Sequence, residues 1–217
     1  MLKYKMYVLL LFIIGSFIFI DVSANELPLK NKIIYLDAGH GGTDPGAIYK
    51  SIKEKDINLE IVNKLKKTLE EKGAKVYLTR YGDYDLAVPN AVNRKRSDLS
   101  RRSNIINESN CDMYLSIHLN AENSSTWNGA QVFYDDVNEN NIKLAKIMQE
   151  EFKRNTNTKR KYQLTNDMYM YKRIKQVGVL IEVGFITNPN ERYLLKQDWY
   201  QNKISNIILS GIIKYFS

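Results

Sequence analysis

The chain has 217 residues, 44% of them hydrophobic, and contains two histidines and one cysteine. This length predicts one ordinary domain or two small ones, and the apolar content argues against a wholly disordered chain. One cysteine excludes an internal disulfide framework and a cysteine-rich zinc module, and two histidines exclude a three-histidine metal site. The formal net charge of +8 favours acidic partners, namely nucleic acid, anionic lipid or an anionic polymer.

Residues 1–24 have the pattern of an export signal. Lys3 and Lys5 precede an apolar run over 6–20, and residues 22–24 resemble a small-residue cleavage site. We predict a cleaved signal peptide. The alternative is an uncleaved N-terminal anchor, because the stretch 4–20 nears the lower length limit for a spanning helix. Either way residues 25–217 lie outside the cytoplasm. Export argues against nucleic acid and favours cell-wall polymers or membrane surfaces as partners.

Residues 25–217 show no internal repeat and no linker rich in proline, glycine or serine, so they are predicted to form one domain. Short apolar stretches predict strands, and apolar residues at helical spacing predict helices. The predicted strands are 32–36, 75–79, 113–117, 130–134 and 177–183. The predicted helices run from Asp56, as a cap, to Gly73, over 99–108 and 142–152, and, as one helix or two, from 189 to about 216, with a long loop over 81–97.

Strands that alternate with helices are typical of an α/β fold. The stretch 177–183 is almost wholly apolar, as the buried centre of a sheet requires. We therefore predict a three-layer sandwich, with a largely parallel central sheet and helices on both faces.

Three polar residues fall where predicted strands end. His40 follows the first strand in a glycine-rich loop, His118 follows the strand over 113–117, and Glu182 lies near the end of 177–183. Sites in open α/β sheets collect at the carboxyl ends of the strands, so these side chains are expected to converge. Two imidazoles and a carboxylate are a common catalytic zinc set, and Glu182 would then be a proton acceptor with a pKa raised by burial.

The residues leave alternatives open. The third ligand could be Glu54 or Asp56, with Asp44 a weaker choice, and Asp56 also suits a helix cap. Either histidine could be a solvated loop residue, and Glu182 a structural carboxylate paired with arginine. The glycine loop lacks the Lys-Ser/Thr ending of a phosphate-binding loop. The basic run 94–96, with Arg101 and Arg102, could be a solvated face or help to bind an anionic glycan.

At these residues the sequence resembles the zinc-dependent N-acetylmuramoyl-L-alanine amidases, the family that includes the AmiC-like catalytic domains. The resemblance covers about 32–216, and the order and spacing of its motifs agree. The matching motifs are IIYLDAGHGGTDPGA (33–47), KEKDINLEI (53–61), LSRRSNIIN (99–107), DMYLSIHLNA (112–121) and VLIEVGFITNPNE (179–191).

The resemblance implies a role for each matching residue. His40, Glu54 and His118 match the ligands of one zinc ion, which favours Glu54 over Asp56, and Glu182 matches the catalytic glutamate. Asn120 and Arg102 match positions that support the site or bind substrate, and Asn188 and Glu191 match residues that organise the turn after the catalytic strand. The implied substrate is peptidoglycan, and the implied reaction cleaves the amide between N-acetylmuramic acid and L-alanine of the stem peptide.

The chain also departs from many relatives. It has no room for a separate wall-binding module, and the segment 119–129 is too short for the regulatory helix that some relatives place there. These departures suggest that an activating or recruiting protein partner is needed. A single-domain exported form resembles the spore-cortex subtype (CwlD type), which prepares muramic-δ-lactam. The expected location is the cell wall or another extracytoplasmic space such as the forespore intermembrane space, with membrane attachment only if the N-terminal segment is uncleaved.

Two other functions compete with this one. A zinc peptidase acting within the stem peptide would use the same ligand set, and an inactive wall-binding protein would keep the fold without turnover. The presence of all four expected polar residues, His40, Glu54, His118 and Glu182, favours the amidase.

Overall fold

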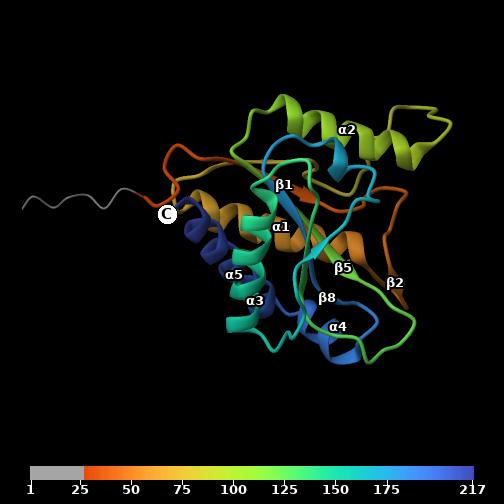
Figure 1. Cartoon of the computed structure of the whole chain (residues 1–217). Helices are drawn as coiled ribbons and strands as arrows, with labels where there is room; N and C mark the ends of the chain where they lie inside the picture. The colour runs from red at the N-terminus through yellow and green to blue at the C-terminus, as the bar shows by residue number, and fades with distance from the viewer. Residues whose placement is uncertain (1–26) are drawn as a thin grey trace, which may run out of the picture.

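The computed structural model describes residues 27–217, and the predicted signal or anchor over 1–24 lies outside them (Figure 1). Across this range no helix is both long enough and apolar enough to cross a membrane. The strands are β1 (Ile33–Ala38), β2 (Ile48–Tyr49), β3 (Ile52–Lys53), β4 (Lys75–Leu78), β5 (Met113–Asn120), β6 (Gln131–Tyr134), β7 (Gln163–Leu164) and β8 (Gly178–Phe185). The helices are α1 (Glu54–Glu70), α2 (Arg94–Glu108), α3 (Asn141–Asn155), the 3₁₀ turn η1 (Tyr171–Arg173), α4 (Pro189–Leu195) and α5 (Asp198–Phe216).

The main sheet has six strands in the order β4-β1-β5-β8-β6-β7. All neighbouring pairs are parallel except β6 and β8, which are antiparallel. A parallel return needs a crossover connection, usually a helix, and the short loop over 121–130 provides none, so β6 runs back against β8. The predicted α/β fold with a largely parallel sheet is confirmed.

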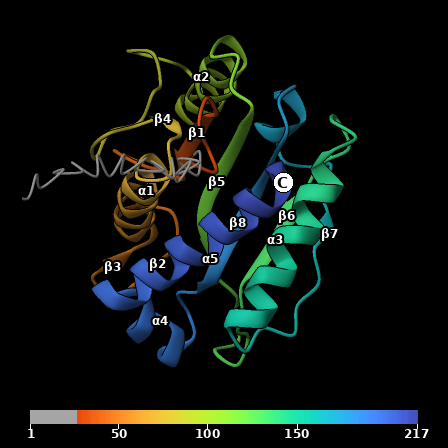
Figure 2. The same cartoon turned by 90° about the vertical axis from the view of Figure 1, so that its left-hand side faces the viewer.

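Helices cover both faces of this sheet. Alternate residues of a strand face opposite sides, so Ile34 and Leu36 of β1 join the core beneath α1, α3 and α5, whereas Tyr35 joins a smaller core with α2 and η1. Figure 2 shows α1, α5 and α3 side by side on one face, with α2 on the other. The predicted three layers are therefore present.

Two predicted helix starts are wrong. Helix α1 begins at Glu54 with Lys53 as its cap, and no side chain caps it, so Asp56 lies within the first turn. The β2–β3 hairpin delivers the chain into the helix earlier than the apolar periodicity indicates, and Asp56 there faces the positive end of the helix dipole. Helix α2 begins at Arg94, because the Asn93 side chain accepts a hydrogen bond from the Arg96 amide.

Four short elements could not be predicted from the sequence. The two-residue strands β2, β3 and β7 and the turn η1 are too short to show a hydrophobic period. The predicted final pair of helices is present as α4 and α5. As the motif match implied, Asn188 accepts hydrogen bonds from the Asn190 and Glu191 amides, and Glu191 accepts from the Phe185 and Gly129 amides.

Candidate metal centre

His40, Glu54 and His118 meet at the carboxyl ends of β1 and β5. One potential ligand atom from each lies within 4.8 Å of the others. Glu54 Oε1 is 3.2 Å from His40 Nε2 and 3.0 Å from His118 Nδ1. Asp56 is exposed on the first turn of α1, so the structure brings Glu54 to both histidines and leaves Asp56 outside the cluster.

The backbone around Glu54 fixes its carboxylate. Oε2 accepts a hydrogen bond from the Ala47 amide at 2.8 Å, and Oε1 accepts one from the Leu119 amide at 3.1 Å. Gly46 has a φ of +66°, and a Cβ there would lie 2.6 Å from Glu54 Oε2. This turn therefore requires glycine both for its conformation and for the space that the carboxylate fills.

Asp44 orients His40. His40 has a φ of 62°, a left-handed conformation uncommon outside glycine, and its Nδ1 lies 2.9 Å from Asp44 Oδ2. With Nδ1 donating to that carboxylate, Nε2 is the ring nitrogen that would bind a metal ion, and it is directed at Glu54. Asp44 thus lies behind His40 rather than beside Glu54, which is the place of an orienting carboxylate.

Two buried arginines hold the backbone of the loop that bears His40. Arg102 donates to the Ala38 and His40 carbonyl oxygens, and Arg80 donates to those of Ala38 and Gly39. Arg102 also pairs with Asp37 at 2.7 Å and Asp98 at 2.9 Å. The loop is thereby fixed through its carbonyls, without an obstruction at the His40 ring.

Arg102 is only 1% exposed, which is incompatible with direct contact with substrate in this structure. The motif match implied either support of the site or substrate binding for Arg102, and a guanidinium directed at the backbone behind His40 fits support of the site. Asn120 is the last residue of β5, partly exposed, and its carbonyl accepts from the Ile186 amide. It lies two residues beyond His118, at the edge of the sheet where the histidines meet.

Tyr171 of η1 belongs to the site, although no sequence pattern or motif pointed to it. Its hydroxyl donates to Ser116 Oγ at 3.1 Å and lies 3.4 Å from His118 Nε2. Ser116 in turn donates to Asp37 Oδ2 at 2.6 Å. With Tyr171 donating to Ser116, its oxygen can accept a hydrogen bond from His118 Nε2, and in that tautomer His118 Nδ1 is free to bind a cation.

Glu182 lies opposite His118 in the β5–β8 register. Its Oε2 is buried and has no hydrogen-bond partner, and within residues 27–217 Glu182 forms no ion pair, so the alternative of an arginine-paired structural carboxylate is wrong. Burial raises the pKa of Glu182 to about 7. A carboxylate of this kind can accept and return a proton near neutral pH.

The cluster has the chemistry of a metal site. Two imidazole nitrogens and one carboxylate oxygen are a common ligand set for a divalent ion with one open position. Burial lowers the pKa of His40, but hydrogen bonds to Asp44 and Glu54 outweigh it and raise that pKa to about 9. The pocket therefore stabilises positive charge at the place where a cation would bind, and the residues present fit a metal ion.

Comparison with known proteins agrees with this geometry. The family model "N-acetylmuramoyl-L-alanine amidase" (Amidase_3) matches residues 34–214. The germination-specific N-acetylmuramoyl-L-alanine amidase of Bacillus subtilis is 44% identical over 196 residues, which are 88% of this chain and 83% of that protein.

Two solved structures share the fold. The CwlD amidase from Clostridioides difficile, solved in complex with the GerS lipoprotein, matches with a TM-score of 0.81 and 44% identity over 85% of this chain and 98% of that chain. An N-acetylmuramoyl-L-alanine amidase from Clostridium difficile 630 matches with a TM-score of 0.76 and 28% identity over 85% and 96%. This chain therefore belongs to the N-acetylmuramoyl-L-alanine amidase family and is one of its enzymes, close in sequence to the germination-specific type.

Proposed function

We propose that this chain is a zinc-dependent amidase of spore cortex peptidoglycan. It cleaves the amide between the lactyl group of N-acetylmuramic acid and L-alanine, the step that precedes muramic-δ-lactam formation. The observation that supports this most directly is the His40–Glu54–His118 cluster beside Glu182 and its unpartnered, buried Oε2. Similarity to the germination-specific amidase of Bacillus subtilis supports the cortex as the substrate.

His40 Nε2, Glu54 Oε1 and His118 Nδ1 would hold the zinc ion. When bound, zinc would polarise the carbonyl of the scissile amide and lower the pKa of a water molecule. Glu182 takes the proton of the attacking water on its carboxylate and passes it to the nitrogen of the departing L-alanine. Asp44 and Tyr171 keep the two imidazoles in the tautomers that leave His40 Nε2 and His118 Nδ1 free. Asn120, at the rim beyond His118, contacts the substrate.

The proposal extends to location and partner. The chain acts outside the cytoplasm, at the cell wall or in the forespore intermembrane space, after export directed by residues 1–24, which are either cleaved or kept as an anchor. The Clostridioides difficile relative was solved with a lipoprotein bound, which supports a protein that recruits or activates this chain. Cortex digestion with and without candidate exported proteins from the same organism tests this part.

Digestion of purified peptidoglycan tests the reaction. The expected products are intact stem peptides with a free L-alanine amine and glycan strands without peptide, identified by mass spectrometry. A chelator should abolish release, and one equivalent of zinc per chain should restore it. Release of D-alanine alone would instead identify a peptidase within the stem peptide, and binding without any product would identify an inactive wall-binding protein.

Substitution of Asp44 by asparagine tests how the first ligand is held. The Asp44→Asn variant should bind zinc about 10- to 100-fold more weakly, because His40 loses the carboxylate that fixes its tautomer. Competition with a chromogenic chelator measures this affinity. The matched control is Asp136→Asn on an exposed position beyond β6, which should bind zinc as the wild type does. Equal affinities in all three proteins would contradict the orienting role of Asp44.

A further inference from the structure

The side of the active site formed by α2 and residues 168–176 has an excess of positive charge. We define the basic surface as Lys95, Arg96, Lys172, Arg173 and Lys175, all of which are exposed. The ion pairs of α2 are made by Arg94 with Asp85 and by Arg102 with Asp37 and Asp98. Within residues 27–217 none of the five side chains of the basic surface forms an ion pair, although Lys95 shares a cavity with Asp44, Asp85 and Asp98 and acts electrostatically on the Asp44 carboxylate.

Local contacts hold these cations in place. The guanidinium carbons of Arg96 and Arg173 lie 5.0 Å and 4.5 Å from the centre of the Tyr169 ring, and Arg96 Nε donates to the Tyr169 hydroxyl at 3.3 Å. Asn107 of α2 donates to the Arg173 carbonyl at 2.7 Å and accepts from the Lys175 amide at 2.9 Å. Helix α2 and residues 168–176 are therefore held together, and their charges form one continuous basic surface. Arg96 and Arg173 lose little side-chain freedom when a ligand binds.

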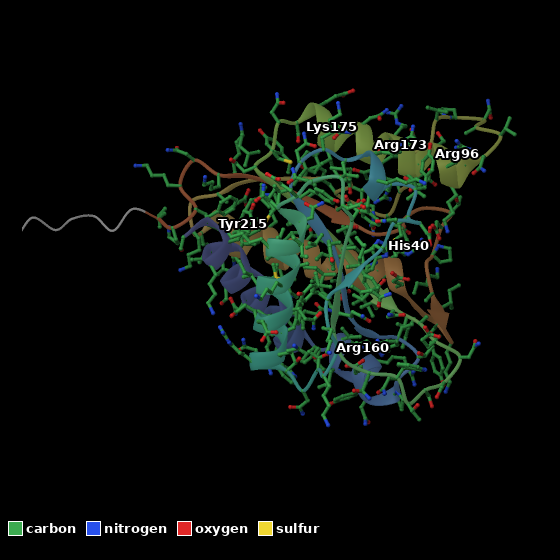
Figure 3. The ribbon with its side chains drawn as sticks, in the orientation of Figure 1. His40, Arg96, Arg160, Arg173, Lys175 and Tyr215 are labelled. Carbon is green, nitrogen blue, oxygen red and sulfur yellow. The ribbon has the colours of Figure 1, made fainter. Side chains whose placement is uncertain are left out.

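The basic surface lies next to residues that contact the candidate metal centre. Tyr171, beside His118, directly precedes Lys172 and Arg173 in the chain. On α2, Lys95 lines a cavity of about 250 Å³ together with Asp44, the partner of His40. Figure 3 shows Lys175, Arg173 and Arg96 along the upper edge of the molecule, with His40 below Arg173.

We propose that the basic surface binds the free carboxylates of the stem peptide, so that the peptide side of the substrate lies along α2 and η1. This inference rests on the proposed function. The scissile amide joins a neutral sugar to a peptide that bears carboxylates at its γ-linked glutamate, its diamino acid and its C-terminus. Fixed cations on the side of Tyr171 and Asp44 attract that half of the substrate, and planar guanidinium groups match carboxylates in a bidentate manner.

Paired substrates test the proposal. One is a muropeptide with free stem-peptide carboxylates, and the other is the same muropeptide with those carboxylates amidated. At low salt the wild type should show a KM about five- to tenfold lower for the free acid, and this preference should fall as salt is added. The Arg96→Gln/Arg173→Gln double variant should lose most of the preference through a raised KM for the free acid.

Two further variants isolate the cause. Arg96→Lys/Arg173→Lys keeps the charge and should keep much of the preference. Lys143→Gln/Lys146→Gln removes two exposed charges from α3, on the opposite face of the sheet, and should keep all of it. A double glutamine variant that raises KM equally for both substrates would overturn the proposal. The proposal would also be overturned if the double glutamine variant kept its preference for the free acid but no longer bound walls that contain an anionic polymer. The basic surface would then bind that polymer rather than the stem peptide.

Failure of the proposed reaction is separable from failure of this inference. If the zinc-loaded wild type cleaves neither substrate, the proposed function fails. Calorimetric titration with the isolated stem peptide still decides the role of the basic surface, since it requires no turnover. The free-acid peptide should bind the wild type and bind at least fivefold more weakly to Arg96→Gln/Arg173→Gln. Equal affinity of the two proteins would refute the inference.

Discussion

Replacing Glu182 with glutamine is expected to lower kcat for cleavage of the muramoyl–L-alanine amide by a factor of about 10² to 10⁴, the usual contribution of a positioned proton acceptor. Glutamine has nearly the same shape but cannot accept the proton of the attacking water. Glu182 is not among the residues that meet in the metal cluster, so the variant should retain one zinc per chain. Mass spectrometry of timed digests gives kcat, and elemental analysis gives the zinc content.

The matched control is Glu139→Gln, an exposed glutamate on the loop after β6, which should digest peptidoglycan at the wild-type rate. A Glu182→Gln protein that keeps its zinc and turns over within a few-fold of the wild type would refute the assigned role. Loss of zinc together with activity would instead show that Glu182 helps to build the metal site. Both readouts are therefore needed on the same preparation.

The convergence of His40, His118 and Glu182 could be predicted because parallel strands place their carboxyl ends at one edge of a sheet. The strand register confirms this convergence for two of them, since His118 and Glu182 are paired neighbours on β5 and β8. The choice of Glu54 over Asp56 could not be made from spacing. It depends on the β2–β3 hairpin, which starts α1 at Glu54, and on amides of Ala47 and Leu119, which fix the carboxylate.

The residues behind the ligands were harder to predict, for a physical reason. A helix segment rich in Arg, Ser and Asp has the pattern of a solvated face, yet Arg102 and Asp98 are buried in this structure. Their burial depends on long-range partners, since Arg102 donates to Asp37 of β1 and to two carbonyls of the His40 loop. Tyr171 reaches the site from a single 3₁₀ turn, which no periodicity reveals.

These long-range partners make Arg102 important for stability as well as for the site. The Arg102→Met variant is expected to lower the free energy of unfolding by about 3–5 kcal/mol, because Asp37 would remain buried without its counter-charge. In the wild type, burial acts to raise the pKa of Asp37, but Arg102 and hydrogen bonds from Ser116 and Thr79 outweigh it and lower that pKa to about 2. Urea unfolding at pH 7 measures the loss.

The pH dependence separates this charge effect from lost packing. A carboxyl group whose pKa is lower in the folded protein stabilises the fold above the ordinary Asp pKa, near 4, and this contribution disappears as the pH falls towards 2. The stability gap between wild type and Arg102→Met should therefore be widest at pH 7 and narrower at pH 3. Arg102→Met/Asp37→Asn should recover part of the loss at pH 7, because position 37 then carries no unpaired charge, although Asp98 still lacks its arginine. Arg101→Met, at an exposed neighbour, should change stability by less than about 0.5 kcal/mol. An equal gap at both pH values, with no recovery in the double variant, would mean that packing rather than the Asp37 charge makes Arg102 necessary.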